Sequence, residues 1–273
     1  MPNSAAAGSS IDWAISAFRP FWFKGKFRLL NKIIPRHGTR TAKVFGCQME
    51  LDLKDLIQRS IYLGTFEPFE TRVVASFLSP GMTVIDVGAN VGYYTALASS
   101  KVGFDGNVIA VEPAPRPFAR LKDMIVKNHL TARAFNFGLG EKSGKEGIYQ
   151  SPDSSNDTPT MVAHGGLSPM TTVEVRSLDD CLDDWRIRHV DLLKIDVEGW
   201  EPRVVAGASR ALASGRIGAI LCEFNGYWLR ANGSSSQTLL KTLMHFGFQP
   251  TGDVNCGSAF DRGITNLLLV RRR

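Results

Sequence analysis

The chain has 273 residues, of which 44% are hydrophobic and 21% charged, and a formal net charge of +6. This composition excludes a wholly disordered chain, a collagen-like repeat and a coiled-coil rod, and no apolar run approaches the roughly 20 residues that span a bilayer. Residues 1–10 lack the basic and apolar regions of a secretory signal, so we expect a cytoplasmic protein. The four cysteines have neither disulfide nor zinc spacing and are expected to be reduced: Cys47, Cys181, Cys222 and Cys256.

The positive charge is concentrated near the N-terminus. Between Asp12 and Glu50 there is no carboxylate, whereas eight lysines and arginines lie there, which leaves −2 for the rest of the chain. A near-neutral body argues against a nucleic-acid-binding groove.

The basic segment predicts an amphipathic helix. Four apolar residues recur at helical spacing: Phe23, Phe27, Leu30 and Ile34. Three cations follow an adjoining stripe, and a proline suits the helix start: Lys24, Arg28, Lys32 and Pro20. Such a helix either contacts an anionic membrane or a phosphorylated substrate, or packs on the main domain with its cations in solvent, and we favour packing.

The remaining elements follow in chain order. A hairpin is expected over residues 42–53 and a helix over 67–78, and we divide the chain into an N-terminal extension over 1–60 and a main domain over 61–273. From residue 83 onward, strands and helices alternate. Strands are predicted over 83–87, 108–111, 133–137, 191–195, 219–224, 248–251 and 265–270, with helices over 93–100, 117–128, 202–213 and 237–246.

These strands are almost continuously apolar, which is typical of a parallel sheet covered on both faces. We therefore expect an α/β fold with a doubly wound, mostly parallel sheet. No helix separates the last two strands, so the last strand is expected to return antiparallel. The polar connection over 150–172 is long enough to be a lid or a binding loop, with disorder as the alternative.

A glycine-bearing turn follows the first parallel strand, where doubly wound sheets bind cofactors. Gly88 and Gly92 would let the backbone approach a ligand without a Cβ, and Glu112, twenty positions after Gly92, suits a ribose diol. A nicotinamide dinucleotide is one candidate, but the turn lacks the G-x-G-x-x-G pattern that accommodates a pyrophosphate. Asp86, within the strand, suits a cationic sulfonium better, which favours S-adenosylmethionine.

Four strings in this order resemble the FkbM family of S-adenosylmethionine-dependent methyltransferases: TVIDVGANVGYYTALAS, VIAVEPAP, VDLLKIDVEGWEPRVVAGA and ILCEFN. The resemblance covers about residues 61–270. It implies a Rossmann-like class I methyltransferase fold with a seven-stranded sheet, and methylation of a hydroxyl on a sugar, glycan or secondary metabolite. It also implies a donor site made of eight residues: Glu67, Asp86, Gly88, Asn90, Gly92, Tyr93, Glu112 and Pro113.

Charged residues cluster at the ends of two neighbouring predicted strands. Lys194 and Asp196 share one strand parity, Glu198 lies just beyond that strand, and Glu223 and Asn225 end the next one. Charged groups within apolar strands are costly unless they are paired or used. The carboxyl edge of the sheet is therefore the expected catalytic centre.

Three interpretations of this cluster remain open. In the favoured one, Asp196 or Glu198 is the general base for the acceptor hydroxyl, Lys194 steadies developing negative charge and Glu223 orients the acceptor. In another, Asp196, Glu223 and Asn225 hold a magnesium-like cation. In the third, Lys194 forms an ion pair that only holds the strands together. A binding domain without catalysis on the same scaffold is the corresponding alternative for the whole protein.

Overall fold

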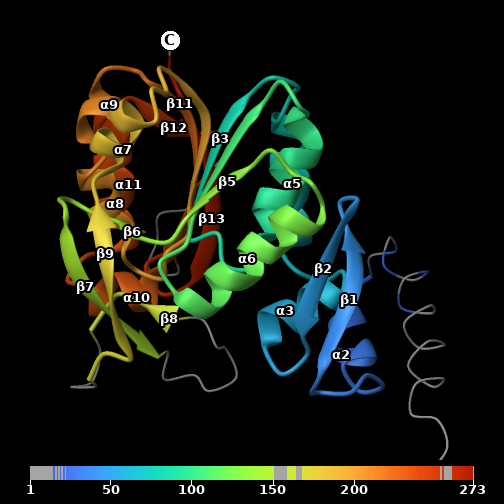
Figure 1. Cartoon of the computed structure of the whole chain (residues 1–273). Coiled ribbons are helices and arrows are strands. Elements are labelled where there is room, and N and C mark those ends of the chain that lie inside the picture. Colours follow the sequence, from blue (N-terminus) through green and yellow to red (C-terminus); the bar gives the residue numbers. More distant parts are fainter. Residues whose placement is uncertain are drawn as a thin grey trace, which may run out of the picture.

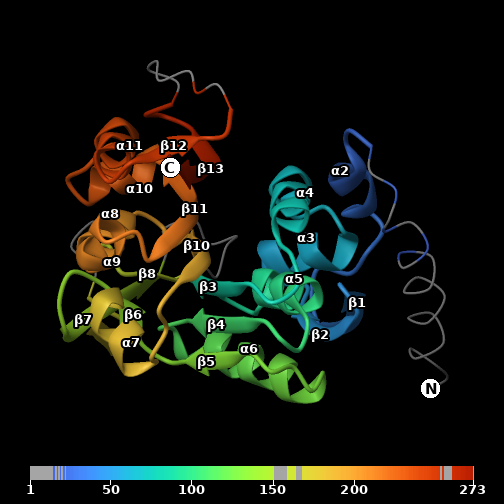
Figure 2. The ribbon, with the colours of Figure 1, turned by 90° about the horizontal axis from the view of Figure 1, so that it is seen from above.

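The computed structural model describes residues 15, 17, 19, 21, 23–150, 159–163, 168–252, 254 and 260–272. A seven-stranded sheet lies at its centre (Figure 1). Its strands follow the order β12-β13-β11-β10-β3-β4-β5 (Figure 2). Its strands are β3 (Thr83–Val87), β4 (Asn107–Val111), β5 (Arg133–Phe135), β10 (Val190–Ile195), β11 (Ile217–Asn225), β12 (Phe248–Pro250) and β13 (Ile264–Arg271).

The sheet is parallel except for β13, which pairs antiparallel with both β11 and β12. The predicted doubly wound sheet with an antiparallel last strand is therefore confirmed. The chain starts the sheet at β3, builds outward through β4 and β5, and then returns to add β10 on the other side of β3. This reversal opens a crevice at the carboxyl ends of β3 and β10.

Helices cover both faces of the sheet, and alternating strand residues face the two layers. Val84 and Val108 belong to one core, whereas their chain neighbours Ile85 and Ile109 belong to the other. The first layer contains α5 (Tyr93–Val102) and α6 (Pro115–Lys127), with α4 (Pro68–Phe77) beside them (Figure 2). The second layer contains α7 (Leu178–Asp184), α8 (Glu201–Ala206), α9 (Ser209–Ala213) and α11 (Ser236–His245), and α10 (Gly226–Ala231) directly follows β11.

The N-terminal part packs on the first layer. It contains α2 (Lys26–Leu30), the hairpin β1 (Thr39–Val44) and β2 (Cys47–Asp52), and α3 (Leu56–Leu63). The buried face of the hairpin belongs to the same hydrophobic core as Val84 and Val108. The hairpin is confirmed with slightly different bounds, whereas a domain boundary at residue 60 stays a prediction.

Three predicted elements need correction. Strand 133–137 ends at Phe135, and helix 202–213 is two helices, because the Asp179 carboxylate accepts the N–H groups of Arg210 and Ala211 and restarts the helix there. The connection 150–172 contributes to a four-stranded sheet that we did not predict from the sequence. The strands of this sheet are β6 (Gly138–Leu139), β7 (Gly144–Gln150), β8 (Pro159–Thr160) and β9 (Thr171–Arg176). Residues 151–158 and 164–167 of the connection lie outside the described part.

The basic segment also differs from its prediction. The α-helix covers only five residues, and the side chain of Lys26 is buried whereas that of Phe23 is 41% exposed. The other three predicted inner residues do pack toward the core: Phe27, Leu30 and Ile34. Pro20 lies outside the described residues.

Two expectations concern cysteines and membrane spans. Cys47, Cys181 and Cys222 are buried free thiols, as predicted, and Cys256 is not among the described residues. Within the part of the chain that the structure describes, every helix is too short or too polar to cross a bilayer.

Candidate functional site

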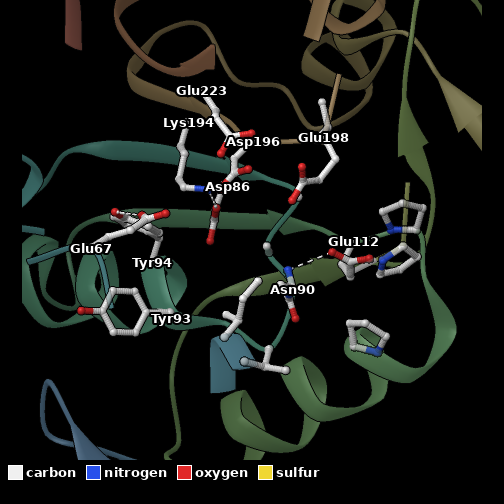
Figure 3. Close-up of a pocket in the computed structure, with 18 of the residues that line it drawn as sticks. Glu67, Asp86, Asn90, Tyr93, Tyr94, Glu112, Lys194, Asp196, Glu198 and Glu223 are labelled. Atoms are coloured by element: carbon white, nitrogen blue, oxygen red, sulfur yellow. Dashed lines mark hydrogen bonds and ion pairs between the residues drawn. The ribbon is translucent and has the colours of Figure 1, made fainter. Parts of the chain in front are cut away.

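A pocket opens at the carboxyl edge of the central sheet, where β3, β4, β10 and β11 end (Figure 3). This is the edge at which doubly wound sheets bind ligands. Residues of α3 and of the segment before α4 line one side, and the turn after β3 lines another. The described lining contains six carboxylic acids and one cation: Glu67, Asp86, Glu112, Asp196, Glu198, Glu223 and Lys194.

The turn after β3 is tightly bent, with positive φ at Gly88, Asn90 and Gly92. A Cβ on Gly88 would lie 1.8 Å from the backbone oxygen of Asp196, and one on Gly92 would lie 2.4 Å from Met124 Cε. The space that both glycines leave is therefore taken up by the protein itself and not, as predicted, by a ligand. Gly92 does not line the pocket, and substitution of Gly88 tests the fold more than ligand binding.

Glu112 fixes this turn from the end of β4. Its Oε2 accepts the N–H of Asn90 at 2.8 Å, and its Oε1 accepts the N–H of Ala114 at the same distance. Burial raises the pKa of Glu112 to about 7, although the two hydrogen bonds favour the charged form. Pro113 lies beside it in the pocket lining. Each carboxyl oxygen has a second lone pair, so Glu112 can still accept a ligand hydroxyl.

Lys194 lies between two carboxylates. Its Nζ donates to Asp196 Oδ2 at 2.9 Å and lies 3.8 Å from Asp86 Oδ1, while Asp86 Oδ2 accepts a hydrogen bond from Thr95. Burial opposes the charged ammonium, but the carboxylates of Asp196, Asp86 and Glu67 outweigh it and raise the pKa of Lys194 above its usual value. Burial raises the pKa of Asp86, whose Oδ1 accepts no hydrogen bond from any described residue.

Glu67 enters the pocket from a strained position. It adopts the left-handed conformation (φ 38°) immediately before α4, and its Oε2 accepts a hydrogen bond from the Tyr94 hydroxyl at 2.5 Å. The Nζ of Lys194 lies 4.7 Å from the centre of the Tyr94 ring, a cation–π distance. Burial and the charge of Asp196 raise the pKa of Glu67 to about 7.

Glu198 and Glu223 form the opposite side of the cluster. Glu198 has a positive φ of 51°, and its Oε2 accepts a hydrogen bond from Asn225 Nδ2 at 3.3 Å. Burial and Asp196 raise the pKa of Glu198 to about 8 and that of Glu223 well above its usual value. Glu223 Oε2 is buried and has no hydrogen-bond partner among the described residues.

The structure brings the predicted residues together. All the predicted catalytic residues line this one pocket, as do all the predicted donor-site residues except Gly92, whereas Asn225 lies behind Glu198. The roles of these residues stay predictions. The described part of the chain contains no group of three or more histidine, cysteine, aspartate or glutamate residues arranged to hold a metal ion.

Sequence reasoning missed two residues that support the site. Tyr94 lines the pocket, and its position beside Tyr93 in the GYYT string gave no indication of which ring would face inward. Glu201 is fully buried, and its Oε1 accepts the N–H groups of Val197 and Gly199, which holds the turn that carries Glu198. The sequence did contain a signal for this role, because a carboxylate in the first turn of a helix often accepts backbone N–H groups of the preceding turn.

Glu201→Gln is expected to flatten the pH dependence of stability. Burial raises the pKa of Glu201 to about 7, so between pH 4.5 and 7 the folded chain holds a proton that the unfolded chain has released. The free energy of unfolding of the parent should therefore fall with rising pH, by up to about 1.4 kcal/mol per pH unit from this group. Glutamine keeps the Oε1 acceptor and removes this slope, which urea unfolding from pH 5 to 8 measures.

The matched control for this prediction is Glu174→Gln, at an exposed position on β9. It should leave the pH slope of the parent unchanged. Equal slopes for the parent and Glu201→Gln would contradict the assignment of a buried proton to Glu201.

Comparison with known proteins gives a consistent set of relatives. The sequence model described as "Methyltransferase FkbM domain" matches residues 86–250. Hexuronic acid methyltransferase AglP of Haloferax volcanii is 31% identical over 129 residues, which cover 47% of this chain and 51% of AglP. The 31-O-demethyl-FK506 methyltransferase FkbM of Streptomyces tacrolimicus is 31% identical over 163 residues, covering 49% of this chain and 62% of that protein.

A solved structure also aligns with nearly the whole chain. Methyltransferase FkbM from Methylobacillus flagellatus KT has a TM-score of 0.48 at 14% identity, with 97% of this chain and 59% of that chain covered. The chain spans less than two thirds of the length of either curated relative.

Proposed function

Because the chain belongs to the FkbM methyltransferase family, we propose that it transfers the methyl group of S-adenosylmethionine to a hydroxyl of a sugar, a glycan or a secondary metabolite. One observation carries this proposal: among the described residues, six carboxylic acids and one cation line a pocket at the switch point of a doubly wound sheet. The acceptor class is supported by the two curated relatives, one named for a hexuronic acid and the other for 31-O-demethyl-FK506. The family assignment replaces the nicotinamide oxidoreductase considered from the turn alone.

The pocket fits a cationic donor. Asp86 Oδ1 and Glu223 Oε2 are buried and accept no hydrogen bond from the described residues, so a ligand that brings N–H groups or positive charge would lower the cost of their burial. Glu112 keeps lone pairs for a ribose hydroxyl, with Asn90 and Pro113 beside it. Tyr93 lines the pocket on the other side, where its ring packs on those of Phe66 and Tyr94 (Figure 3). When bound, S-adenosylmethionine supplies an electrophilic methyl group on a sulfonium centre.

Asp196 is proposed as the general base. A neutral alcohol is a weak nucleophile until a positioned base takes its proton. The Asp196 carboxylate is partly exposed to the pocket, while Oδ2 is held by Lys194 at 2.9 Å. The other carboxylate oxygen is therefore available to accept the acceptor's hydroxyl proton.

Lys194 is proposed as a positioning residue. Its ammonium is almost fully buried and already contacts Asp196 and Asp86. It orients the base and balances the negative charge of Asp86, which differs from the predicted role of steadying charge on the acceptor.

Glu198 and Glu223 are proposed to orient the acceptor. The pKa of about 8 favours the protonated form of Glu198 at neutral pH, and a protonated carboxyl can donate a hydrogen bond to a second hydroxyl of the acceptor. Burial and the charge of Asp196 raise the pKa of Glu223 in the same direction. Asn225 holds Glu198 in place through its amide. In the metal-assisted alternative, Asp196, Glu223 and Asn225 hold a cation. This alternative predicts that methyl transfer depends strictly on added Mg²⁺, which a methyl-transfer assay with and without Mg²⁺ tests.

The proposed function is tested by methyl-labelled S-adenosylmethionine, the full-length chain, and glycan and metabolite extracts from cells that lack the protein. We expect a labelled methyl ether on one class of acceptor, found by mass spectrometry. Donor binding measured by calorimetry should weaken by roughly 1–3 kcal/mol in Glu112→Ala, because a buried hydrogen-bond acceptor is lost.

Glu174→Ala, remote from the pocket lining, is the control for donor affinity. Unchanged affinity in a folded Glu112→Ala would contradict the donor site. Tight donor binding without transfer to any extract would favour a binding domain on a methyltransferase scaffold.

A further inference from the structure

The segment over residues 21–36 exposes both apolar side chains and cations, and we call these exposed side chains together the basic face. It contains four apolar and four basic residues: Phe21, Phe23, Leu29, Ile33, Lys24, Arg28, Lys32 and Arg36. The side chains of Leu29 and Ile33 are 57% and 65% exposed. In both views α2 lies at the periphery of the molecule, beside α3 (Figures 1 and 2).

The fold does not use the apolar part of the basic face. On the inner side of the same turns, Phe27, Leu30 and Ile34 pack against the core. Leu29 lies in α2 and Ile33 in the turn that follows this helix, and both side chains are exposed to solvent instead of packing on the core. An apolar pair that the domain leaves in water is typical of an interaction surface.

The cations of the basic face are equally unused. Lys24, Arg28, Lys32 and Arg36 are exposed, and none of them forms an ion pair with a described residue. No carboxylate occurs between Asp12 and Glu50 to offset them. The surface is complementary to a negatively charged partner.

We propose that the basic face binds the surface of an anionic phospholipid bilayer. Apolar side chains flanked by lysine and arginine match the headgroup region, where the cations meet lipid phosphates and the apolar groups enter the acyl boundary. A nucleic acid offers phosphates to the cations but would leave Leu29 and Ile33 largely in water. The apolar component thus favours lipid.

The basic face is firmly attached to the catalytic domain. Lys26 Nζ donates to the carbonyl oxygens of Arg19 and Gly64 at 3.0 and 3.4 Å, and Arg19 donates to the carbonyl oxygen of Ile61 at 2.7 Å. Ile61 belongs to α3 and lines the pocket, and Gly64 is the C-cap of that helix. Binding of a bilayer here would hold the pocket close to the membrane surface.

The test is co-sedimentation of the full-length chain with vesicles of phosphatidylcholine, with or without phosphatidylglycerol. We expect binding only to the anionic vesicles, and weaker binding as salt is raised. The quadruple variant Lys24→Gln/Arg28→Gln/Lys32→Gln/Arg36→Gln should lower the partition coefficient at least about a hundredfold, since each cation near an anionic surface contributes roughly a factor of five. The variant Leu29→Ser/Ile33→Ser should lower it about tenfold or more, because it removes buried apolar area.

Matched controls show whether binding depends on the residues of the basic face or on the charge and apolar surface of the whole protein. Lys24→Arg/Lys32→Arg keeps the charge and should bind like the parent. Lys142→Gln/Lys145→Gln and Phe104→Ser change exposed residues of the same kinds elsewhere and should also have no effect.

Three results would overturn the proposal. They are absence of binding to anionic vesicles, binding that Leu29→Ser/Ile33→Ser leaves unchanged, and complete displacement from vesicles by a short RNA duplex at equal phosphate concentration. Methyl transfer to a soluble acceptor should be the same in the parent and in every basic-face variant, so failure of this proposal is distinguishable from failure of the proposed function.

Discussion

Asp196→Asn is expected to lower kcat for methyl transfer about 10²–10⁴-fold with little change in donor affinity. The asparagine keeps the size of the side chain and can still accept the Lys194 hydrogen bond, which is 2.9 Å long in the parent. It removes the basic oxygen that accepts the proton of the acceptor hydroxyl, and positioned general bases contribute on this scale. Steady-state kinetics and calorimetry with S-adenosylmethionine measure the two effects separately.

The chain offers a matched control on the same strand. Asp191 lies near the other end of β10, where its Oδ2 accepts the N–H of Thr83 at 2.8 Å. Asp191→Asn should therefore leave kcat unchanged. If Asp196→Asn has the kcat of the parent while Glu198→Gln has lost activity, Glu198 is the base. In that case the kcat of the parent should rise with pH, with an apparent pKa near the value of about 8 that burial gives Glu198.

Lys194→Met is expected to lower the free energy of unfolding by about 3–5 kcal/mol at pH 8. Removing one partner of a buried ion pair leaves an uncompensated charge, here on Asp196 and Asp86. The pKa of Lys194 is raised in the folded chain, so its stabilising contribution is complete at every pH below its unfolded value of about 10.5 and is present at pH 8. Urea unfolding with circular dichroism measures the loss.

Two variants show whether the loss comes from burial of the pair. Lys127→Met breaks an exposed ion pair with Glu50 and should cost little stability, because water and salt screen such a pair. The double variant Lys194→Met/Asp86→Asn should recover part of the stability, because it also removes one of the two carboxylates that lose their ion pair. Equal costs for Lys194→Met and Lys127→Met would contradict the buried-pair explanation.

The central sheet and the location of the site could be predicted from the sequence. Almost continuously apolar runs at 83–87, 108–111 and 191–195 predicted parallel strands, because a strand that is covered on both faces has few polar residues. Polar residues at the ends of such strands must meet at one edge of the sheet. For that reason Glu112, Asp196 and Glu223 could be placed in one pocket before any contact was known.

The sequence could not determine local features that depend on distant neighbours. In the four-stranded sheet, β6 and β8 have only two residues each, and β7 and β9 contain many glycine, threonine and charged residues, so no long apolar run indicates these strands. Lys26 can be buried because the carbonyl oxygens of Arg19 and Gly64 accept hydrogen bonds from its ammonium group. Nothing in the neighbouring sequence indicates these partners.

The reason for the turn glycine and the pKa values of the buried acids become visible only in the tertiary structure. Gly88 is required by the backbone of Asp196, which lies in the neighbouring strand end more than a hundred positions along the chain. The raised pKa values of Glu67, Glu198 and Glu223 arise from burial and from their shared neighbour Asp196. Residue type sets the ordinary pKa of a carboxyl group, but only its position among the other charges and away from water sets the pKa that it has in the site.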